Sequence, residues 1–379
     1  MQELSIRNAR IVTADAVVDG TVKLRDGIIA AVDSGPAAPA DAIDFGGDYL
    51  LPGLVELHTD NLEKHLQPRP GVFWPNAVAS ICAHDLQVAG AGITTVYDAI
   101  SVGEYREDSG RKELLPKAVA AIKRARDEGL LRAEHLLHLR CEVGDSQVVA
   151  MFEPFADDPL VQLVSLMDHT PGQRQWRDMA SFKRFHQERG LTDAEFRAEI
   201  ETRRISQARY ADRHRQQIIA LVRDRDIPLA SHDDTTEEHV EEAHAAGMTI
   251  SEFPCSTVAA HKARARDMGI IMGAPNVVRG GSHSGNVSAL ELGGLGLLDG
   301  LSSDYVPASL IHAAFVLVDR LGFSMPDAVA TVTRNPARMA RLDDRGEIAV
   351  GKRADLVRVG VIDDLPVVRT TWREGRQVV

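Results

Sequence analysis

The sequence predicts an α/β protein, a (β/α)8 TIM-like barrel with a small β-sandwich formed by the N- and C-terminal segments. Three observations predict this fold. From residue 51 onward, short apolar runs alternate with helical stretches, as in βα units. Residues 1–50 and the tail from residue 346 have instead the short strands and turn signals of antiparallel sheet. Histidines and acids follow the apolar runs, at the end where a barrel builds its active site.

The two terminal segments predict the sandwich domain, residues 1–50 plus 346–379. Strand patterns occupy residues 4–6, 9–13, 21–24 and 28–32, and again 346–348, 354–359, 367–372 and 377–379. Asp19-Gly20 and Asp26-Gly27 are hairpin signals, because glycine accepts the positive φ that tight turns require. We expect the strands of the two ends to pair with each other.

Eight apolar runs predict the strands of the barrel domain, residues 51–345. They lie at residues 54–58, 93–98, 135–141, 161–167, 227–231, 249–253, 270–273 and 301–304. Eight parallel strands with helical crossovers close most economically into a barrel. The clearest helix, residues 113–128, has one apolar and one basic face. The apolar face carries Leu114, Val119, Ile122 and Ala125, and the basic face carries Lys117, Lys123, Arg124 and Arg126.

The connection between residues 169 and 227 is much longer than the others and is rich in Arg, Gln and Glu. Long insertions at the top of a barrel often form lids over the active site. A solvated helical pair without a role in function fits the composition equally well. The sequence leaves these two interpretations of the 170–226 insertion open.

Charge and cysteine content limit the partners. The chain has 43 basic and 55 acidic residues, a net charge of -12, which disfavours nucleic acid and anionic membrane. Its three cysteines are far apart and suit a reducing cytoplasm. No apolar run of about 18 residues and no signal-peptide pattern is present. We expect a cytoplasmic protein, and assembly into a homo-oligomer stays open.

Polar side chains with metal-binding chemistry follow five of the eight runs. Because residues i and i+2 of a strand point the same way, the side chains of His58 and Asp60 can reach one ion. A single histidine at a strand end is more often structural, and a single aspartate is often a helix N-cap. Six such residues at one end of a barrel favour a metal site over those readings. The predicted ligands are His58, Asp60, Glu142, His169, His232 and Asp304.

The predicted ligand set indicates hydrolytic chemistry. Imidazoles mixed with carboxylates suit zinc first, with manganese or iron as alternatives, and one or two ions. Divalent ions lower the pKa of water to about 7 and polarise the bond under attack. A carboxylate such as Glu142 suits a bridge between two ions, and Asp304 is the candidate catalytic residue that orients the hydroxide and moves its proton.

Several segments resemble the amidohydrolase superfamily. Residues 51–58 resemble its opening strand, and residues 333–338 and 351–357 resemble its closing segment. A closer similarity is to the PhnM branch, the diphosphatases of phosphonate metabolism. It covers residues 56–64, 138–142, 165–175, 230–234, 272–286 and 302–305.

This resemblance implies hydrolysis of α-D-ribose 1-methylphosphonate 5-triphosphate to the 5-phosphate and diphosphate. The chain departs from the wider superfamily in its ligands. The usual His-x-His is His58-x-Asp60, and Glu142 stands where a bridging lysine is usual. The later histidines follow runs four and five, where five and six are commoner. The number of ions, and the choice between Asp168 and His169 as ligand, stay open.

A small anionic phosphorylated substrate requires cations and backbone amides. The candidate contacts are Lys64, Arg69, Arg140, Arg174, Arg279 and His283, the last within the glycine-rich loop 280–286. Salt bridges with acids and a plain turn are the competing interpretations. Two other functions remain: hydrolysis of an amide or cyclic amide, as by an N-acyl amino acid deacylase or a dihydroorotase-like enzyme, and an inactive barrel used for assembly.

Overall fold

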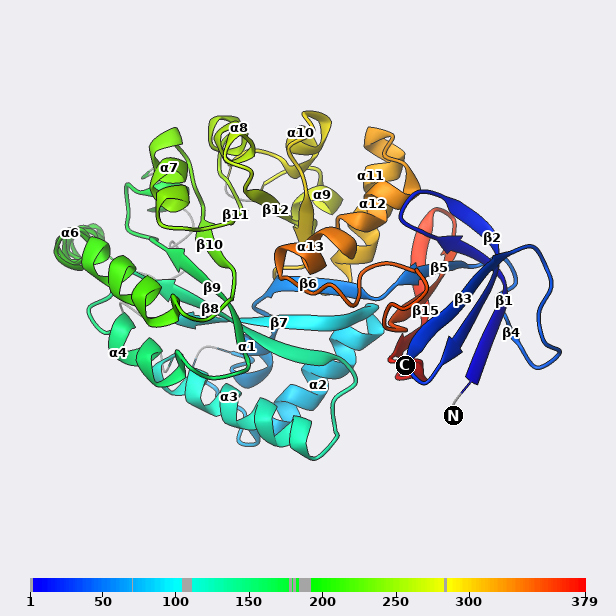
Figure 1. Ribbon diagram of the computed structural model, residues 1–379. Coiled ribbons are helices and arrows are strands. Elements are labelled where there is room, and N and C mark those ends of the chain that lie inside the picture. The colour runs from blue at the N-terminus through cyan, green and yellow to red at the C-terminus, as the bar shows by residue number, and fades with distance from the viewer. Residues whose placement is uncertain are drawn as a thin grey trace.

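A computed structural model describes residues 3–69, 71–103, 111–176, 179, 182–183, 192–282 and 285–379. Its strands form two sheets of eight strands each, a parallel barrel and a mixed sheet beside it (Figure 1). The predicted fold class is confirmed. The limits of the two domains stay a prediction.

Each of the eight apolar runs overlaps one barrel strand. Neighbouring strands pair in parallel from β6 to β13. An isolated parallel bridge between Thr59 and Asp304 brings the two ends of the sheet together. The strands are β6 (Leu54–Thr59), β7 (Ile93–Val102), β8 (Glu134–Glu142), β9 (Val161–Met167), β10 (Leu229–His232), β11 (Ile250–Glu252), β12 (Gly269–Gly273) and β13 (Gly300–Ser302).

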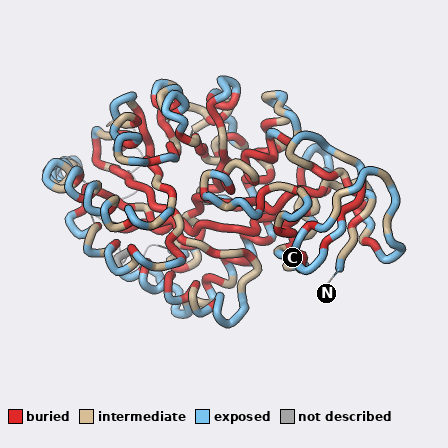
Figure 2. Tube along the Cα trace, viewed as in Figure 1, coloured by how far each residue is buried: buried red, intermediate tan, exposed pale blue. Residues whose placement is uncertain are grey.

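Helices surround the barrel, and the strands are buried on both faces, as Figure 2 shows. The inner core contains Val55, Leu57, Tyr97, Leu163 and Ile250. The helices are α1 (Asn61–Leu66), α2 (Ala77–Gly90), α3 (Arg111–Asp127), α4 (Val148–Phe152), α6 (Asp193–Val222), α7 (Glu237–Ala245), α8 (Thr257–Ala265), α9 (Ala274–Arg279), α10 (Ala289–Gly294), α11 (Ser309–Leu321), α12 (Met325–Ala330) and α13 (Arg334–Met339), with 3-10 turns η1 (Glu153–Phe155) and η2 (Arg174–Trp176).

Helix α3 begins and ends close to the predicted limits. The four side chains predicted to face the core are all buried. Three of the four basic side chains are exposed, and Lys123 is half-buried beside Asp158. The 3.6-residue period of apolar side chains therefore identified this helix and the face that it packs on the barrel.

The terminal segments pair with each other, as predicted, in a mixed sheet of order β16-β15-β14-β5-β1-β2-β3, with β4 beside β1. Strand β14 of the tail pairs with β5 of the start. The sheet encloses an apolar core that includes Ile11, Phe45, Leu356 and Trp372. Its strands are β1 (Glu3–Val12), β2 (Val17–Arg25), β3 (Ile28–Ser34), β4 (Ile43–Asp44), β5 (Tyr49–Pro52), β14 (Leu356–Ile362), β15 (Leu365–Arg373) and β16 (Arg376–Gln377).

Two strand predictions in this sheet were wrong. Residues 4–6 and 9–13 were expected as separate strands, but β1 is continuous. It absorbs the irregularity through a register shift between Ile6 and Ala9, where Asn8 has a φ of 53°. Residues 346–348 form no strand.

Candidate metal-binding active site

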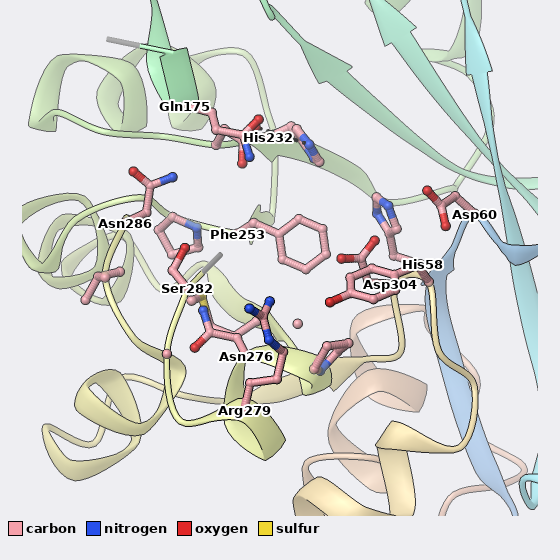
Figure 3. A pocket seen from close by; sticks show the side chains of 18 of the residues that line it. His58, Asp60, Gln175, His232, Phe253, Asn276, Arg279, Ser282, Asn286 and Asp304 are labelled. Atoms are coloured by element: carbon pink, nitrogen blue, oxygen red, sulfur yellow. Dashed lines mark ion pairs between the residues drawn. The ribbon is translucent and has the colours of Figure 1, made fainter. Parts of the chain in front are cut away.

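A cavity of ≈ 450 Å³ lies at the carboxyl ends of the barrel strands. Figure 3 shows that its side chains come from distant segments and point toward a common space. Eight of the residues singled out from the sequence line it, and they bring together three imidazoles, two carboxylates and three cationic side chains. They are His58, Asp60, Lys64, Arg140, His169, His232, Arg279 and Asp304.

Three side chains in this cavity form a cage for a cation. Ligand atoms of His169, His232 and Asp233 all lie within 4.8 Å of one another. The Oδ2 atom of Asp233 is 3.5 Å from Nε2 of His169 and 3.4 Å from Nε2 of His232. This oxygen is buried without a hydrogen-bond partner. A buried acceptor left in that state is costly, so a bound divalent ion fits the donors that are present.

Asp233 was not among the predicted ligands. It directly follows His232, and strict strand alternation places successive side chains on opposite faces. The backbone of Asp233 has a φ of 58°, however, which breaks the alternation and returns its side chain to the cavity. The repeated acids at positions 233 and 234 were the signal available in the sequence.

Glu252, at the end of β11, orients two of the imidazoles. Its Oε1 lies 2.6 Å from Nδ1 of His58, and its Oε2 lies 2.7 Å from Nδ1 of His232. Burial opposes its charge, but His58 and His138 hold the pKa of Glu252 well below its ordinary value. Because a carboxylate only accepts hydrogen bonds, both imidazoles carry their proton on Nδ1. Nε2 of each ring is thereby left as a lone pair for a ligand.

Glu142 orients the imidazole of His169, as Glu252 orients those of His58 and His232. Its Oε2 lies 2.8 Å from Nδ1 of His169, and its Oε1 accepts the backbone N–H of His169 at 3.1 Å. Glu142 is absent from the cavity lining, so the structure does not place it as a bridge between two ions. Burial opposes protonation of His169, but Glu142 and Asp233 raise the pKa of His169 to about 9. A metal ion that enters the cage therefore displaces a proton.

His169, and not Asp168, faces the cavity. Asp168 accepts the backbone N–H of Thr170 at 3.0 Å and the side-chain amide of Gln207 at 3.2 Å. Its carboxylate is therefore used in shaping the loop behind the cavity. His138 is also engaged elsewhere: its Nδ1 lies 2.9 Å from the carbonyl of Leu57, and its Nε2 lies 2.8 Å from Oγ of Ser165.

Glu56 ties the first and last strands of the barrel together. Its two oxygens accept the backbone N–H of His58 and of Ser303, both at 2.6 Å. Burial raises the pKa of Glu56 to about 8. The backbone of Asp304 also bonds to His58 and Asp60, at 3.0 and 3.1 Å. These contacts fix the side chains of the first strand relative to Asp304.

Two of the predicted substrate contacts lie away from the cavity. Arg174 is buried, forms an ion pair with Asp234 and donates to the carbonyl of His232 at 3.0 Å. Its guanidinium supports the end of β10 from behind, because a buried carboxylate was the nearest partner. Arg69 is exposed in a turn that bridges to Val72. His283 lies outside the described residues.

The remaining cations surround the cage. Nζ of Lys64 is 3.8 Å from Asp60 and 4.9 Å from the centre of the Tyr305 ring. Nε of Arg140 is buried without a hydrogen-bond partner. Arg279, at the end of α9, directs its guanidinium into the cavity (Figure 3). These cations can receive several anionic oxygens next to a metal ion.

The 170–226 insertion contributes helix α6, which has 30 residues and begins with a capping box at Thr192. Its side chains bond to the loops that follow β8 and β9. Ser206 donates to the carbonyl of Gly144 at 2.7 Å, His214 to that of Val143 at 3.1 Å, and Arg204 to that of Pro171 at 3.1 Å. Glu142 ends β8 directly before the first of these loops, and His169 lies on the second, so α6 braces one side of the cavity.

Comparisons with known proteins agree with this geometry. The sequence pattern of the amidohydrolase family matches residues 76–379. The α-D-ribose 1-methylphosphonate 5-triphosphate diphosphatase of Escherichia coli K12 is 46% identical over 376 residues, which cover 98% of this chain and 99% of that enzyme. The L-hydantoinase of Paenarthrobacter aurescens is 27% identical over 100 residues, 26% of this chain and 20% of that protein.

Solved structures share the fold at low sequence identity. The 5-methylcytosine deaminase of Klebsiella pneumoniae superposes with a TM-score of 0.66 at 16% identity, over 99% of this chain and 97% of that one. The N-acetylglucosamine-6-phosphate deacetylase of Pasteurella multocida has a TM-score of 0.66 at 14% identity, over 99% of both chains. Within the described part of the chain, no helix has the length and apolar character needed to cross a membrane.

Proposed function

The chain belongs to the amidohydrolase family and is a metal-dependent hydrolase, and from this premise we propose that it cleaves α-D-ribose 1-methylphosphonate 5-triphosphate to the 5-phosphate and diphosphate. One observation carries the proposal. The cage of His169, His232 and Asp233 opens into the same cavity as Lys64, Arg140 and Arg279. A triphosphate needs both a metal site and several cations, whereas an N-acyl amino acid or dihydroorotate carries a single carboxylate and needs one cation.

The residues proposed to hold one or two ions are those whose donor atoms face the cavity. Oδ1 of Asp60, like Oδ2 of Asp233, is buried without a hydrogen-bond partner, which supports a cation near both. Zinc suits this mixture best, and manganese or iron are the alternatives. When bound, the metal lowers the pKa of water and polarises the phosphoryl oxygens. The set is His58, Asp60, His169, His232, Asp233 and Asp304, with Glu142 orienting His169.

The protein's own side chains bind the substrate and move a proton. Arg279, Arg140 and Lys64 bind oxygens of the triphosphate and hold its chain across the cavity. Water attacks the phosphorus next to the ribose oxygen, and its proton passes to the carboxylate of Asp304. The bond between that phosphorus and the diphosphate oxygen breaks, and diphosphate leaves.

The three cysteines, Cys82, Cys141 and Cys255, form no disulfide, which supports the proposal of a cytoplasmic location.

The test is product analysis of the metal-loaded protein. It is incubated separately with the ribose triphosphate substrate, with an N-acyl amino acid and with dihydroorotate. We expect diphosphate and the 5-phosphate from the first and no turnover of the other two. Hydrolysis of an amide with no release of diphosphate would instead establish amide hydrolysis. The Asp304→Asn protein is the control for contaminating phosphatases.

A further inference from the structure

A second cluster of imidazoles and carboxylates lies outside the cavity, between the barrel wall and helix α2. His84 and Asp85 come from α2, Asp98 from β7 and His135 from β8. The side chains of all four have 0% exposure. Ligand atoms of His84, Asp98 and His135 lie within 4.8 Å of one another, as in the catalytic cage. The cluster contains the residue types of a metal site, and nothing in the proposed reaction uses it.

Unlike the cage, this cluster has its hydrogen bonds complete. Asp98 lies 2.7 Å from Nε2 of His84 and 2.7 Å from Nδ1 of His135. Nε2 of His135 lies 3.3 Å from Asp85, which also accepts the backbone N–H groups of Arg132 and Ala133 at 2.8 and 2.9 Å. Among the described residues, the buried polar atoms left without a partner include none from this cluster. No acceptor here requires a cation, in contrast to Oδ2 of Asp233.

The directions of the hydrogen bonds locate a proton. His135 stands between Asp85 and Asp98, and carboxylates only accept, so both ring nitrogens of His135 must carry hydrogen. The amide of Asn61 donates to Nδ1 of His84 at 3.0 Å, so His84 is neutral and donates from Nε2 to Asp98. Burial opposes their ionisation, but His135 and other hydrogen-bond donors lower the pKa of Asp85 and Asp98. With both carboxylates ionised, one arrangement of protons satisfies every bond, and it makes His135 an imidazolium.

We propose that this cluster is held by a proton instead of a metal ion: His135 is a buried imidazolium at neutral pH. The relay of hydrogen bonds that it completes, from Asp85 through His135, Asp98 and His84 to Asn61, is a positioning element for the cavity. Two carboxylates face one imidazolium and the guanidinium of Arg132, whose Nη1 is 3.2 Å from Asp85. The charges therefore sum to zero, as a buried cluster requires. Burial opposes protonation, but Asp98 and Asp85 raise the pKa of His135 to about 9. The other titratable groups beside it are His84, whose pKa burial lowers, and His65 beyond it.

The relay reaches the cavity through Asn61, the residue after Asp60. The backbone N–H of Asn61 donates to Oγ1 of Thr59 at 3.3 Å, and that hydroxyl donates to the carbonyl of Asp304 at 2.8 Å. Asn61 is thus bonded to the relay by its side chain and to the ligand-bearing strand ends by its backbone. This positioning role rests on the proposed function, whereas the protonation of His135 does not.

Protonation is tested on the chelator-treated wild-type protein. Nitrogen NMR of 15N-histidine-labelled protein at pH 7.5 should show two imidazoliums that stay charged until about pH 9, those of His135 and of His169 in the metal-free cage. The contribution of the His135 imidazolium to the free energy of unfolding is fully present below pH 6.5, the ordinary pKa of histidine. It is lost as the pH rises through about 9, the pKa of His135 in the folded protein. The two values, 6.5 and about 9, correspond to a roughly 300-fold fall in the folding equilibrium constant.

Two comparisons complete this test. His135→Gln should remove one of the two imidazolium signals and reduce the pH-dependent loss of stability, whereas His261→Gln, at an exposed position on α8, should change neither. Should His135→Gln not fold, the spectrum of His169→Gln still decides, because the signal of His135 is then separated from that of His169. A neutral His135 at pH 7.5 would overturn the proposal. So would a wild-type protein that holds one more metal ion per chain than His84→Gln.

Positioning is tested separately with Asn61→Ala and Gln87→Ala. The side chain of Asn61 donates to both His84 and Gln87. Gln87 is exposed and lies outside the buried relay. Asn61→Ala should weaken Mn²⁺ binding to the apoprotein about 10-fold or more, and it should lower the melting temperature because Nδ1 of His84 loses its buried donor. Gln87→Ala should leave Mn²⁺ binding unchanged. Equal Mn²⁺ affinity in both variants would refute the positioning role, even where the protein still releases diphosphate.

Discussion

Replacement of Glu252 by glutamine tests whether one carboxylate sets the ligand atoms of two histidines. The wild-type side chain accepts Nδ1–H of His58 at 2.6 Å and of His232 at 2.7 Å. Glutamine has the same shape but only one acceptor oxygen, and its NH₂ group donates. One of the two imidazoles must then move its proton to Nε2, where it blocks the lone pair that would bind a metal.

The expected magnitude follows from that geometry. Loss of an orienting partner weakens metal binding by about 10- to 100-fold, or about 1.4–2.8 kcal/mol. Glu252→Gln removes the shared acceptor of two imidazoles, so we expect the upper part of this range. The fold should persist, because glutamine fills the same volume and still accepts one of the two hydrogen bonds.

The assay is calorimetric titration of the chelator-treated protein with Zn²⁺ or Mn²⁺, with thermal unfolding of the apoprotein measured in parallel. Glu237→Gln is the matched control, because Glu237 stands on α7 with a side chain 57% exposed. We expect weaker binding in Glu252→Gln and wild-type binding in Glu237→Gln. Metal affinity that is unchanged in Glu252→Gln would refute the tautomer argument, whatever happens to the rate of hydrolysis.

Three further predictions concern the cavity. Asp304→Asn should keep the fold and the metal content but lose turnover, because an amide accepts no proton from water; a wild-type kcat would remove Asp304 from that role. Arg279→Ala should raise the KM for the triphosphate about 10- to 100-fold with metal content unchanged, and Arg69→Ala, outside the cavity, should leave KM unaltered; equal effects would contradict the assigned lining. Gln207→Ala removes the 3.2 Å bond to Asp168 and should weaken metal binding several-fold, whereas Gln216→Ala, at an exposed position on the same helix, should not; matching affinities would show that α6 does not brace the site.

The barrel was predictable because strands that are buried on both faces have nearly continuous apolar sequences. Eight such runs separated by helical stretches are compatible with few folds other than a barrel. The meeting of the candidate ligands was predictable for the same reason, since parallel strands bring their carboxyl ends to one face. His58, His169, His232 and Asp304 meet in one cavity although almost 250 positions separate the first from the last.

Site residues whose placement depends on local backbone geometry or on neighbours in space could not be predicted from the sequence. Asp233 required knowledge of a positive φ, and Glu252 lies inside an apolar run, where its partners on β6 and β10 are invisible in the sequence. Arg174 was expected on the substrate, but a nearby buried carboxylate, Asp234, binds its guanidinium. Such pairings depend on which side chains are adjacent in space, and periodicity carries no information about that.

Two histidine and carboxylate clusters, the cage and the relay, show why residue type alone does not identify a metal site. The cage and the relay both bring three ligand atoms within 4.8 Å of one another. They differ in what the surrounding backbone and side chains supply. Around Asp85 and Asp98, amide and imidazole N–H groups fill the acceptors, and one proton balances the charge. Around Asp233 the nearest nitrogens, Nε2 of His169 and of His232, lie 3.5 and 3.4 Å from Oδ2 and form no hydrogen bond with it, so this acceptor is left for a divalent cation. An unfilled acceptor among oriented lone pairs, more than the presence of histidine, therefore distinguishes a site for catalysis from one that stabilises the fold.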